Sequence, residues 1–230
     1  MIEEPGPHAD LFGHGTACAG IIHRLAPEAR VTSVRVLGKT LTGRGKVFLQ
    51  AVAWAVARGY DIINLSLNTT KRDWALPLYE ICDRAYFRNC FVVTAASNYP
   101  VPSFPSLYSS VASVACNLSR DPFEFYVNPE PPTEFLAPGI DLEVAWRGGT
   151  TVRATGNSLA APHISGIAAL IRSKHPALRP PDLKTALRAC AANLPAAHRS
   201  RAPAWELRET GVSARVRSAI LPSMDARNRD

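Results

Sequence analysis

Residues 61–96 read DIINLSLNTTKRDWALPLYEICDRAYFRNCFVVTAA, and this stretch decides the fold class. It begins and ends with short, nearly continuous apolar runs, at 61–67 and 91–96. Such runs are typical of strands that are buried on both faces of a sheet. Between them, residues 74–89 carry apolar side chains at helical spacing, which predicts a helix. We therefore expect a strand–helix–strand unit whose parallel strands are joined by a right-handed crossover.

The alternation of strands and helices continues on both sides of this unit. Upstream, the pattern predicts a strand over 31–37 and a helix over 45–58. Downstream, beyond proline-rich loops, it predicts short strands and then helices, over 111–116, 142–146, 151–154, 159–174 and from 181 or 182 to 191. This order predicts an α/β fold of three layers, a mostly parallel sheet with helices on both faces.

The surplus positive charge of the chain lies near its end. Residues 1–170 hold 14 Lys and Arg against 14 Asp and Glu, whereas residues 171–230 hold 12 against 5. We expect one domain over 1–195 and a basic C-terminal tail of low order over 196–230. Such a tail attracts polyanions weakly. Because no aromatic interleaving or zinc-finger spacing accompanies the charge, we expect no specific nucleic-acid partner.

Membrane insertion, export and metal binding receive no support from the sequence. No apolar run approaches the about 18 residues of a membrane span, and the start, MIEEPG, has no features of a signal peptide. For the chain as numbered, the expectation is a cytoplasmic protein with no membrane partner. The five cysteines are scattered without a Cys-x-x-Cys pair. We expect them to be reduced core residues, and we expect neither a metal site nor a cofactor.

Three residues are of types used in nucleophilic catalysis. His14 lies in GHGTACAG, at the start of a run that can open a helix, where the helix dipole favours a neutral imidazole base. Ser158 lies where a loop meets the next helix, with its backbone N–H directed at any oxyanion. Asn98 follows a buried strand and can donate its amide to that oxyanion. Taken singly, the three also fit a turn histidine, a helix N-cap and an Asx turn.

In their order along the chain, these segments and one further strand resemble motifs of the subtilisin family of serine proteases. The likeness runs from about residue 10 to residue 192. His-Gly-Thr-x-x-Ala-Gly at His14 resembles the family's histidine motif, and residues 63–67, INLSL, resemble its substrate-binding strand. Residues 95–98, AASN, resemble its oxyanion-asparagine motif, and residues 156–163, GNSLAAPH, its nucleophile motif. The resemblance implies a subtilisin-like fold and a serine endopeptidase.

The resemblance also implies a role for each matched residue. Ser158 would attack a peptide carbonyl, His14 would take its proton and return it to the leaving amine, and Asn98 with the Ser158 N–H would hold the oxyanion. The partner would be an extended peptide or protein substrate, recognised mainly through its main chain. The resemblance implies that the residues which bind this substrate are Ser66, Leu67, Asn68, Ala95, Ala96 and Ser97.

The family's catalytic aspartate has no counterpart in the sequence. It belongs to an Asp-Thr-Gly or Asp-Ser-Gly motif on an interior strand, and no such motif precedes His14. We expect Asp10 to match a surface residue instead, one interior strand of the sheet to be missing, and catalysis to be weakened. In subtilisin itself, loss of the aspartate costs roughly 3 × 10⁴ in kcat, and loss of serine or histidine about 2 × 10⁶. The aspartate segment could be absent through a misplaced start or a processing event, or another polypeptide could supply it.

Smaller departures from the family pattern support a second hypothesis. Asn68 and Ser97 stand where the family has glycine, and Asn157 stands where it has threonine. Together with the missing aspartate, they fit a pseudoprotease that binds a peptide or a partner without cleaving it. Cys18, close to His14, is interpreted as a small buried residue rather than a thiol nucleophile.

Overall fold

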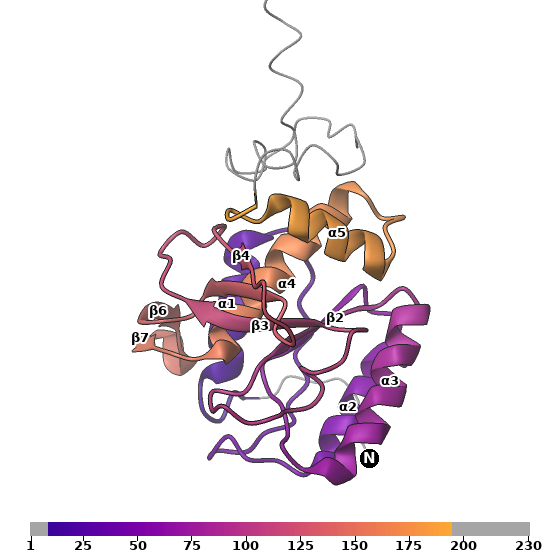
Figure 1. Cartoon of the computed structure of the whole chain (residues 1–230). Coiled ribbons are helices and arrows are strands. Elements are labelled where there is room, and N and C mark those ends of the chain that lie inside the picture. The colour runs from indigo at the N-terminus through magenta and orange to yellow at the C-terminus, as the bar shows by residue number, and fades with distance from the viewer. Residues whose placement is uncertain (1–8, 195–230) are drawn as a thin grey trace, which may run out of the picture.

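The computed structural model describes residues 9–194, so the basic tail expected over 196–230 lies outside the described residues. Its main sheet has five strands in the order β1-β2-β3-β5-β4 (Figure 1). The first four of these are parallel, and β4 is antiparallel to β5. This agrees with the predicted mostly parallel sheet. The strands are β1 (Ile62–Leu65), β2 (Phe91–Ala95), β3 (Ala112–Asn117), β4 (Tyr126–Val127) and β5 (Phe135–Pro138).

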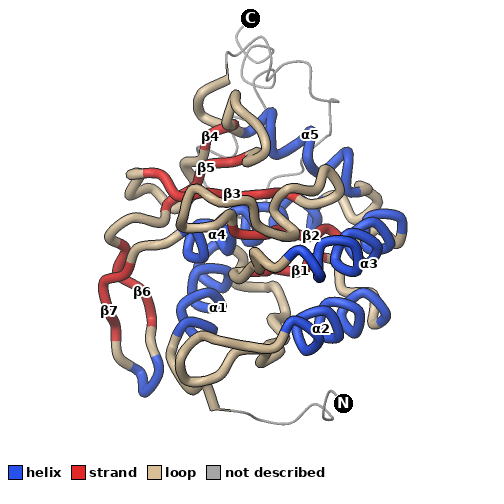
Figure 2. The backbone as a smooth tube through the Cα atoms, turned by 60° about the horizontal axis from the view of Figure 1, so that its bottom comes forward, coloured by secondary structure: helices blue, strands red, loops and turns tan. Residues whose placement is uncertain are grey.

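Helices cover both faces of this sheet, so the predicted three layers are confirmed (Figures 1 and 2). On one face lie α2 (Gly45–Ala57) and α3 (Ala75–Phe87), the latter preceded by the short turn η1 (Arg72–Trp74). On the other face lie α4 (Asn157–Lys174) and α5 (Pro180–Cys190). The first helix, α1 (His14–Leu25), packs against α4.

The strand β2 contributes side chains to two hydrophobic cores, one on each face of the sheet. Val92 of β2 packs with α2 and α3, whereas its neighbours Phe91 and Val93 pack with α4 and α5. Successive side chains of a strand point to opposite faces, so a continuous apolar run fills both cores. Each of these buried side chains contributes about 1.5–3 kcal/mol to the free energy of folding.

The helix α4 runs through the interior and is buried on nearly all sides. Small residues make this possible. A Cβ added at Gly166 would lie 2.8 Å from the Cβ of Leu25, so glycine at this position lets α1 and α4 approach closely. Because α1 begins at His14 and α4 begins beside Ser158, the packing of these two helices brings two candidate residues together.

A two-stranded antiparallel hairpin leads directly into α4. It consists of β6 (Leu142–Ala145) and β7 (Thr151–Ala154), joined through the short turn η2 (Arg147–Gly149). Its inner residue Val144 packs with α1 and with Leu159 of α4. The hairpin therefore supports the start of the helix that carries Ser158.

Two differences from the predicted elements have physical reasons. Residues 31–37 form no strand, and Val31 is 45% exposed. β-branched residues form a strand only beside a partner, and within residues 9–194 no strand pairs with the outer edge of β1. The strands β4 and β5 were not predicted, because they are short and β5 ends in a proline.

The other predicted elements occur close to their expected bounds. In the described part of the chain, no helix is both long enough and apolar enough to cross a membrane.

Candidate active site

His14 and Ser158 meet although 144 positions separate them in the sequence. Nε2 of His14 lies 2.8 Å from Oγ of Ser158, and both side chains are half-buried. At this distance, the hydroxyl can donate its proton to a neutral imidazole. The pair therefore has the geometry of a nucleophile and its general base.

The loop before His14 is held in place by Trp146 of the hairpin. Gly13 has φ 121°, and a Cβ built on it would lie 2.2 Å from the Trp146 ring. Glycine is thus required at position 13, both for its backbone conformation and for the close approach of the ring. The same ring makes an edge-on contact with Phe12, with centroids 5.4 Å apart. The loop before His14 is therefore packed on the hairpin that leads to Ser158.

Asp10 caps α1, and both of its oxygens are used in doing so. Oδ1 accepts from the N–H groups of Phe12 and Gly13, and Oδ2 accepts from the N–H and the hydroxyl of Thr16. Burial alone would raise the pKa of Asp10, but the bonds from Thr16, Gly13 and Phe12 lower it from 3.8 to about 2. Its carboxylate therefore orders the helix start rather than the imidazole of His14.

Replacing Asp10 with alanine is expected to lower the free energy of unfolding by about 1 kcal/mol near neutral pH, because the helix loses its cap. Since the folded pKa is depressed, the carboxylate stabilises the fold above pH 3.8 and ceases to do so as the pH falls toward 2. Denaturant titrations of both proteins across this range check the prediction. Asp10→Asn, which keeps an acceptor without the charge, is the matched control. A difference between the unaltered chain and Asp10→Ala that stays constant down to pH 2 would contradict the role.

The carbonyl of Ser158 is open to a side chain because of a proline. Pro162 is the sixth residue of α4, and it lacks the N–H that would bond this carbonyl. Instead, the thiol of Cys18 donates to the backbone carbonyl oxygen of Ser158, at 3.6 Å.

The same thiol faces the second nitrogen of the imidazole. Sγ of Cys18 lies 3.6 Å from Nδ1 of His14. When the thiol donates its proton to the Ser158 carbonyl, the sulfur lone pairs face Nδ1, and this arrangement favours a proton on Nδ1 and a free Nε2. Burial raises the pKa of Cys18 to about 11, an effect partly offset by the Ser66 hydroxyl, so Cys18 stays a neutral thiol.

Asn98 borders the same small space as Ser158. Its Oδ1 accepts from the backbone N–H of Asn157 at 2.9 Å, which leaves its NH2 group as the end that can donate. A Cβ placed on Gly156 would lie 3.4 Å from Oγ of Ser158 and 3.7 Å from Nδ2 of Asn98. The structure thus brings together all three residues that the sequence singled out for chemistry.

The sequence and the fold match those of known proteins. The model of the Subtilase family matches residues 3–211. The chain belongs to the subtilase family. It is 30% identical over 202 residues to subtilisin DY of Bacillus licheniformis, covering 81% of this chain and 73% of that protein. It is 34% identical over 187 residues to the thermostable alkaline protease of Halalkalibacterium halodurans, covering 75% of this chain and 50% of that protein.

Solved structures resemble the subtilase in fold. A cold adapted subtilisin-like serine proteinase superposes with a TM-score of 0.68 at 24% identity, covering 80% of this chain and 72% of that one. The S41 psychrophilic protease gives 0.70 at 23%, covering 82% and 72%. By homology, the chain falls among the serine-type endopeptidases, hydrolases that act on peptides or proteins. It spans about half the length of several curated relatives, such as subtilisin E of Bacillus subtilis at 49%.

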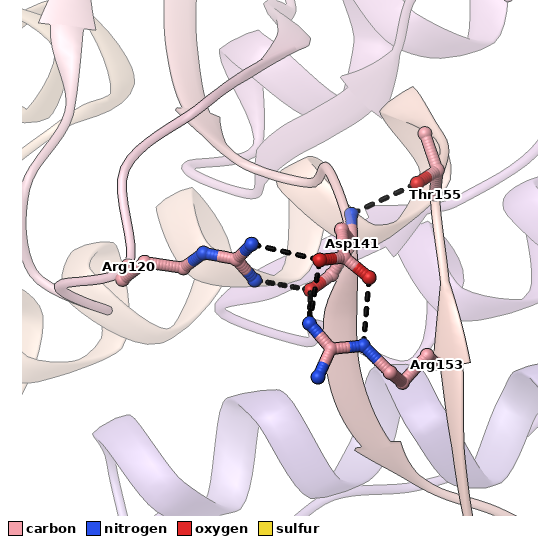
Figure 3. Close-up of polar contacts among 4 residues, drawn as sticks. All are labelled: Arg120, Asp141, Arg153 and Thr155. Carbon is pink, nitrogen blue, oxygen red and sulfur yellow. Dashed lines mark hydrogen bonds and ion pairs between the residues drawn. The ribbon is translucent and has the colours of Figure 1, made fainter.

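In this subtilase, a surface ion-pair cluster lies around Asp141, close in sequence to the start of α4 (Figure 3). Asp141 accepts from Arg120 and Arg153, and its backbone N–H donates to the hydroxyl of Thr155 at 2.8 Å. Hydrogen bonds from Arg153 and then Arg120 hold the pKa of Asp141 far below its usual range. Exposed pairs contribute little stability, but this cluster fixes the residue that precedes Gly156.

The residues that the resemblance implies for peptide binding come from two neighbouring strands of the subtilase. Ser66, Leu67 and Asn68 follow β1, whereas Ala95 ends β2 and Ala96 and Ser97 follow it. Because β1 and β2 are parallel, both sets lie at the same end of the sheet, where the carboxyl ends of the strands are. Nδ2 of Asn68 donates to the carbonyl of Ala95 at 3.3 Å, which links the two segments directly.

Candidate ligands for a metal ion do not gather in the described part of the subtilase. Among residues 9–194, no group of three or more His, Cys, Asp or Glu side chains is placed to hold a metal ion.

Proposed function

We propose that the chain hydrolyses peptide bonds with Ser158 as the nucleophile and His14 as the base. The Ser158 oxygen forms a bond to the peptide carbonyl carbon while its proton moves to Nε2 of His14. The C–N bond then breaks, and His14 returns the proton to the leaving amine. Water attacks the acyl-enzyme in the same way and releases the acid. Asn98 and the Ser158 N–H would stabilise the oxyanion of each tetrahedral intermediate.

The contact of 2.8 Å between Nε2 of His14 and Oγ of Ser158 is the observation that carries this proposal. It is supported by the position of Asn98 beside Gly156 and by the Nδ1 proton that Cys18 favours. A base with its free lone pair on Nε2 is the tautomer that a serine nucleophile needs.

The proposed substrate is an extended peptide or protein segment. It would lie along residues 66–68 and residues 95–97, which stand at or just beyond the carboxyl ends of β1 and β2. The Asn68 amide lies between these segments and would be displaced from the Ala95 carbonyl, or would bond to the substrate itself.

The described residues provide no carboxylate beside Nδ1 of His14, where a triad would have one; the neighbour there is Cys18. We propose that a carboxylate from outside the described residues, on an upstream segment of the protein or on another polypeptide, strengthens this site. The position of β1 supports this proposal. The residue that follows β1 is Ser66, and its side chain forms a hydrogen bond with the Cys18 thiol. A strand added parallel to β1 would therefore end near Nδ1 of His14. Without that carboxylate, the proposed activity is weak.

Treatment with a fluorophosphonate probe tests the proposed function. An activated serine hydroxyl displaces fluoride from the probe, so we expect the chain to gain the mass of the phosphonyl group on Ser158. Folding is checked in the same sample by a cooperative thermal melt. A folded chain whose Ser158 remains unmodified would contradict the proposal.

The labelling rate is expected to fall as the pH drops below 6.5, with a flat region near neutral pH. Burial lowers the pKa of His14 from 6.5, although the charge of Asp10 raises it in part, and only the neutral imidazole acts as a base. Asp10→Asn removes that charge and is expected to move the acidic limb to lower pH. Rates of Ser158 modification from pH 4 to pH 8 provide the measurement. An upward shift of the limb in Asp10→Asn would contradict the assignment of His14.

A pseudoprotease that binds peptides or a partner without cleaving them is the second candidate. It is favoured by the neutral neighbour of Nδ1 and by the Asn68 side chain, which lies between the two proposed binding segments. This candidate predicts peptide binding with no turnover. Peptide cleavage that disappears in Ser158→Ala would exclude it.

A further inference from the structure

One side chain ties the loop of Asn98 to the nucleophile helix. Asn157 is the first residue of α4, immediately before Ser158, and only 8% of it is exposed. The resemblance to known motifs gave it no role and marked it only as a departure, since threonine is usual there. Its hydrogen bonds nevertheless reach two other segments of the fold.

Both ends of the Asn157 amide are used. Its Oδ1 accepts from the backbone N–H of Cys116 on β3 at 2.9 Å. Its Nδ2 donates to the carbonyl oxygens of Ala96 and Ser97, at 3.3 and 2.8 Å. The side chain therefore clamps the loop that follows β2 against the neighbouring strand β3.

The backbone of Asn157 completes the connection. Its N–H donates to Oδ1 of Asn98 at 2.9 Å, which uses one of the N–H groups that a helix start leaves without a helical partner. This bond sets which end of the Asn98 amide faces the helix. The NH2 end is thereby available on the side of Gly156 and Ser158.

A threonine could not replace this set of contacts. A hydroxyl has one proton to donate, whereas the Asn157 amide donates to two carbonyls and accepts from one N–H. Loss of the amide would leave buried backbone groups of the loop and of β3 without partners. The loop would then relax, and Asn98 would move with it.

We propose that Asn157 is a positioning residue for the oxyanion hole. It holds residues 96–98 so that the Asn98 amide is aligned, before reaction, with the carbonyl that Ser158 attacks. This inference rests on the proposed function and deepens it. Asn157 does not touch the reacting atoms and acts only through Asn98 and its loop.

The test compares Asn157→Asp and Asn157→Thr in the full chain, each with and without Asn98→Ala. Asn157→Asp keeps the shape and the acceptor for Cys116 but removes both donors to the loop, so it decides the result even if Asn157→Thr does not fold. We expect kcat for peptide cleavage to fall roughly tenfold or more, but by no more than the about 10²–10³ that complete loss of an oxyanion donor costs. The fall in kcat is the diagnostic result, because the oxyanion interaction strengthens only in the transition state, whereas KM also responds to residues 96 and 97 of the proposed binding segment.

In the Asn98→Ala background, the same substitutions are expected to change kcat by less than about twofold, because the group that they misplace is absent. Asn117→Thr is the matched control. Asn117 lies on β3 and is 9% exposed, and its amide bonds the backbone of Leu136 and Ser119. We expect this control to lower the melting temperature without changing kcat.

Two outcomes would overturn the inference alone. One is an equal loss of kcat with and without Asn98; the other is a loss that follows the melting temperature in the same way as for Asn117→Thr. Absence of any Ser158-dependent cleavage by the unaltered chain would overturn the proposed function, and the inference with it.

Discussion

Replacing Ser158 with alanine is expected to abolish modification of the chain by a fluorophosphonate and to lower kcat for peptide cleavage. The size of the loss depends on the carboxylate at Nδ1 of His14. In subtilisin itself, removing serine costs about 2 × 10⁶ in kcat and removing aspartate roughly 3 × 10⁴, and these effects are far from additive. With Cys18 as the neighbour of Nδ1, we expect Ser158→Ala to lose only roughly two orders of magnitude. With a carboxylate supplied, we expect Ser158→Ala to lower kcat by about six orders of magnitude.

A second serine on the same helix is the matched control for this substitution. Ser173 lies at the exposed end of α4, and its hydroxyl donates to the carbonyl of Leu170. Ser173→Ala is expected to keep both labelling and cleavage, with kcat measured on one peptide for all variants. Cleavage by Ser158→Ala at the rate of the unaltered chain would show that another group, or a contaminant, is responsible.

Replacing Asn98 with alanine is expected to lower kcat by about 10²–10³, or about 2.7–4 kcal/mol of activation free energy, with little change in KM. This is the cost of one oxyanion donor in subtilisin itself. The donor acts only on the charge that develops in the transition state, so binding of the ground-state peptide is unaffected. The Asn98 side chain lies beside Gly156, next to Ser158, with its carbonyl end held by Asn157. Steady-state kinetics on a peptide substrate measure the effect.

An asparagine outside the site controls for general loss of structure. Asn193 bonds both the N–H and the carbonyl of Val127 through its side chain. Asn193→Ala is expected to lower the melting temperature while leaving kcat unchanged. If Asn98→Ala instead raised KM and spared kcat, Asn98 would be a substrate-binding residue and its place in the oxyanion hole would be wrong.

Much of the fold could be predicted because the strands are buried on both faces. The apolar run of β2 and the small residues of α4 are dictated by their environment, so the pattern alone identified them. Residues 31–37 have an equally strong strand pattern, yet they form none, because pairing depends on a partner that composition does not reveal. Asp10, the capping residue of α1, shows the same limit, since its role depends on the fold of the adjacent loop.

The candidate site was predictable as far as residue types and order carried the signal. The convergence of His14, Ser158 and Asn98 follows from the packing of α1 on α4 and from the position of the loop after β2, which no periodicity encodes. Asn157 was missed because its partners lie 41, 60 and 61 positions away in the chain. The only available signal was that an amide replaces a hydroxyl beside the serine.

The open outer flank of β1 has a consequence for this protein in concentrated solution. Within residues 9–194, its outward N–H and C=O groups pair with no other strand, and such a flank can template the addition of extended chain from a neighbouring molecule. The strand is only four residues long, so each addition gains few backbone bonds. Mutations that lengthen this strand are therefore expected to promote ordered aggregation.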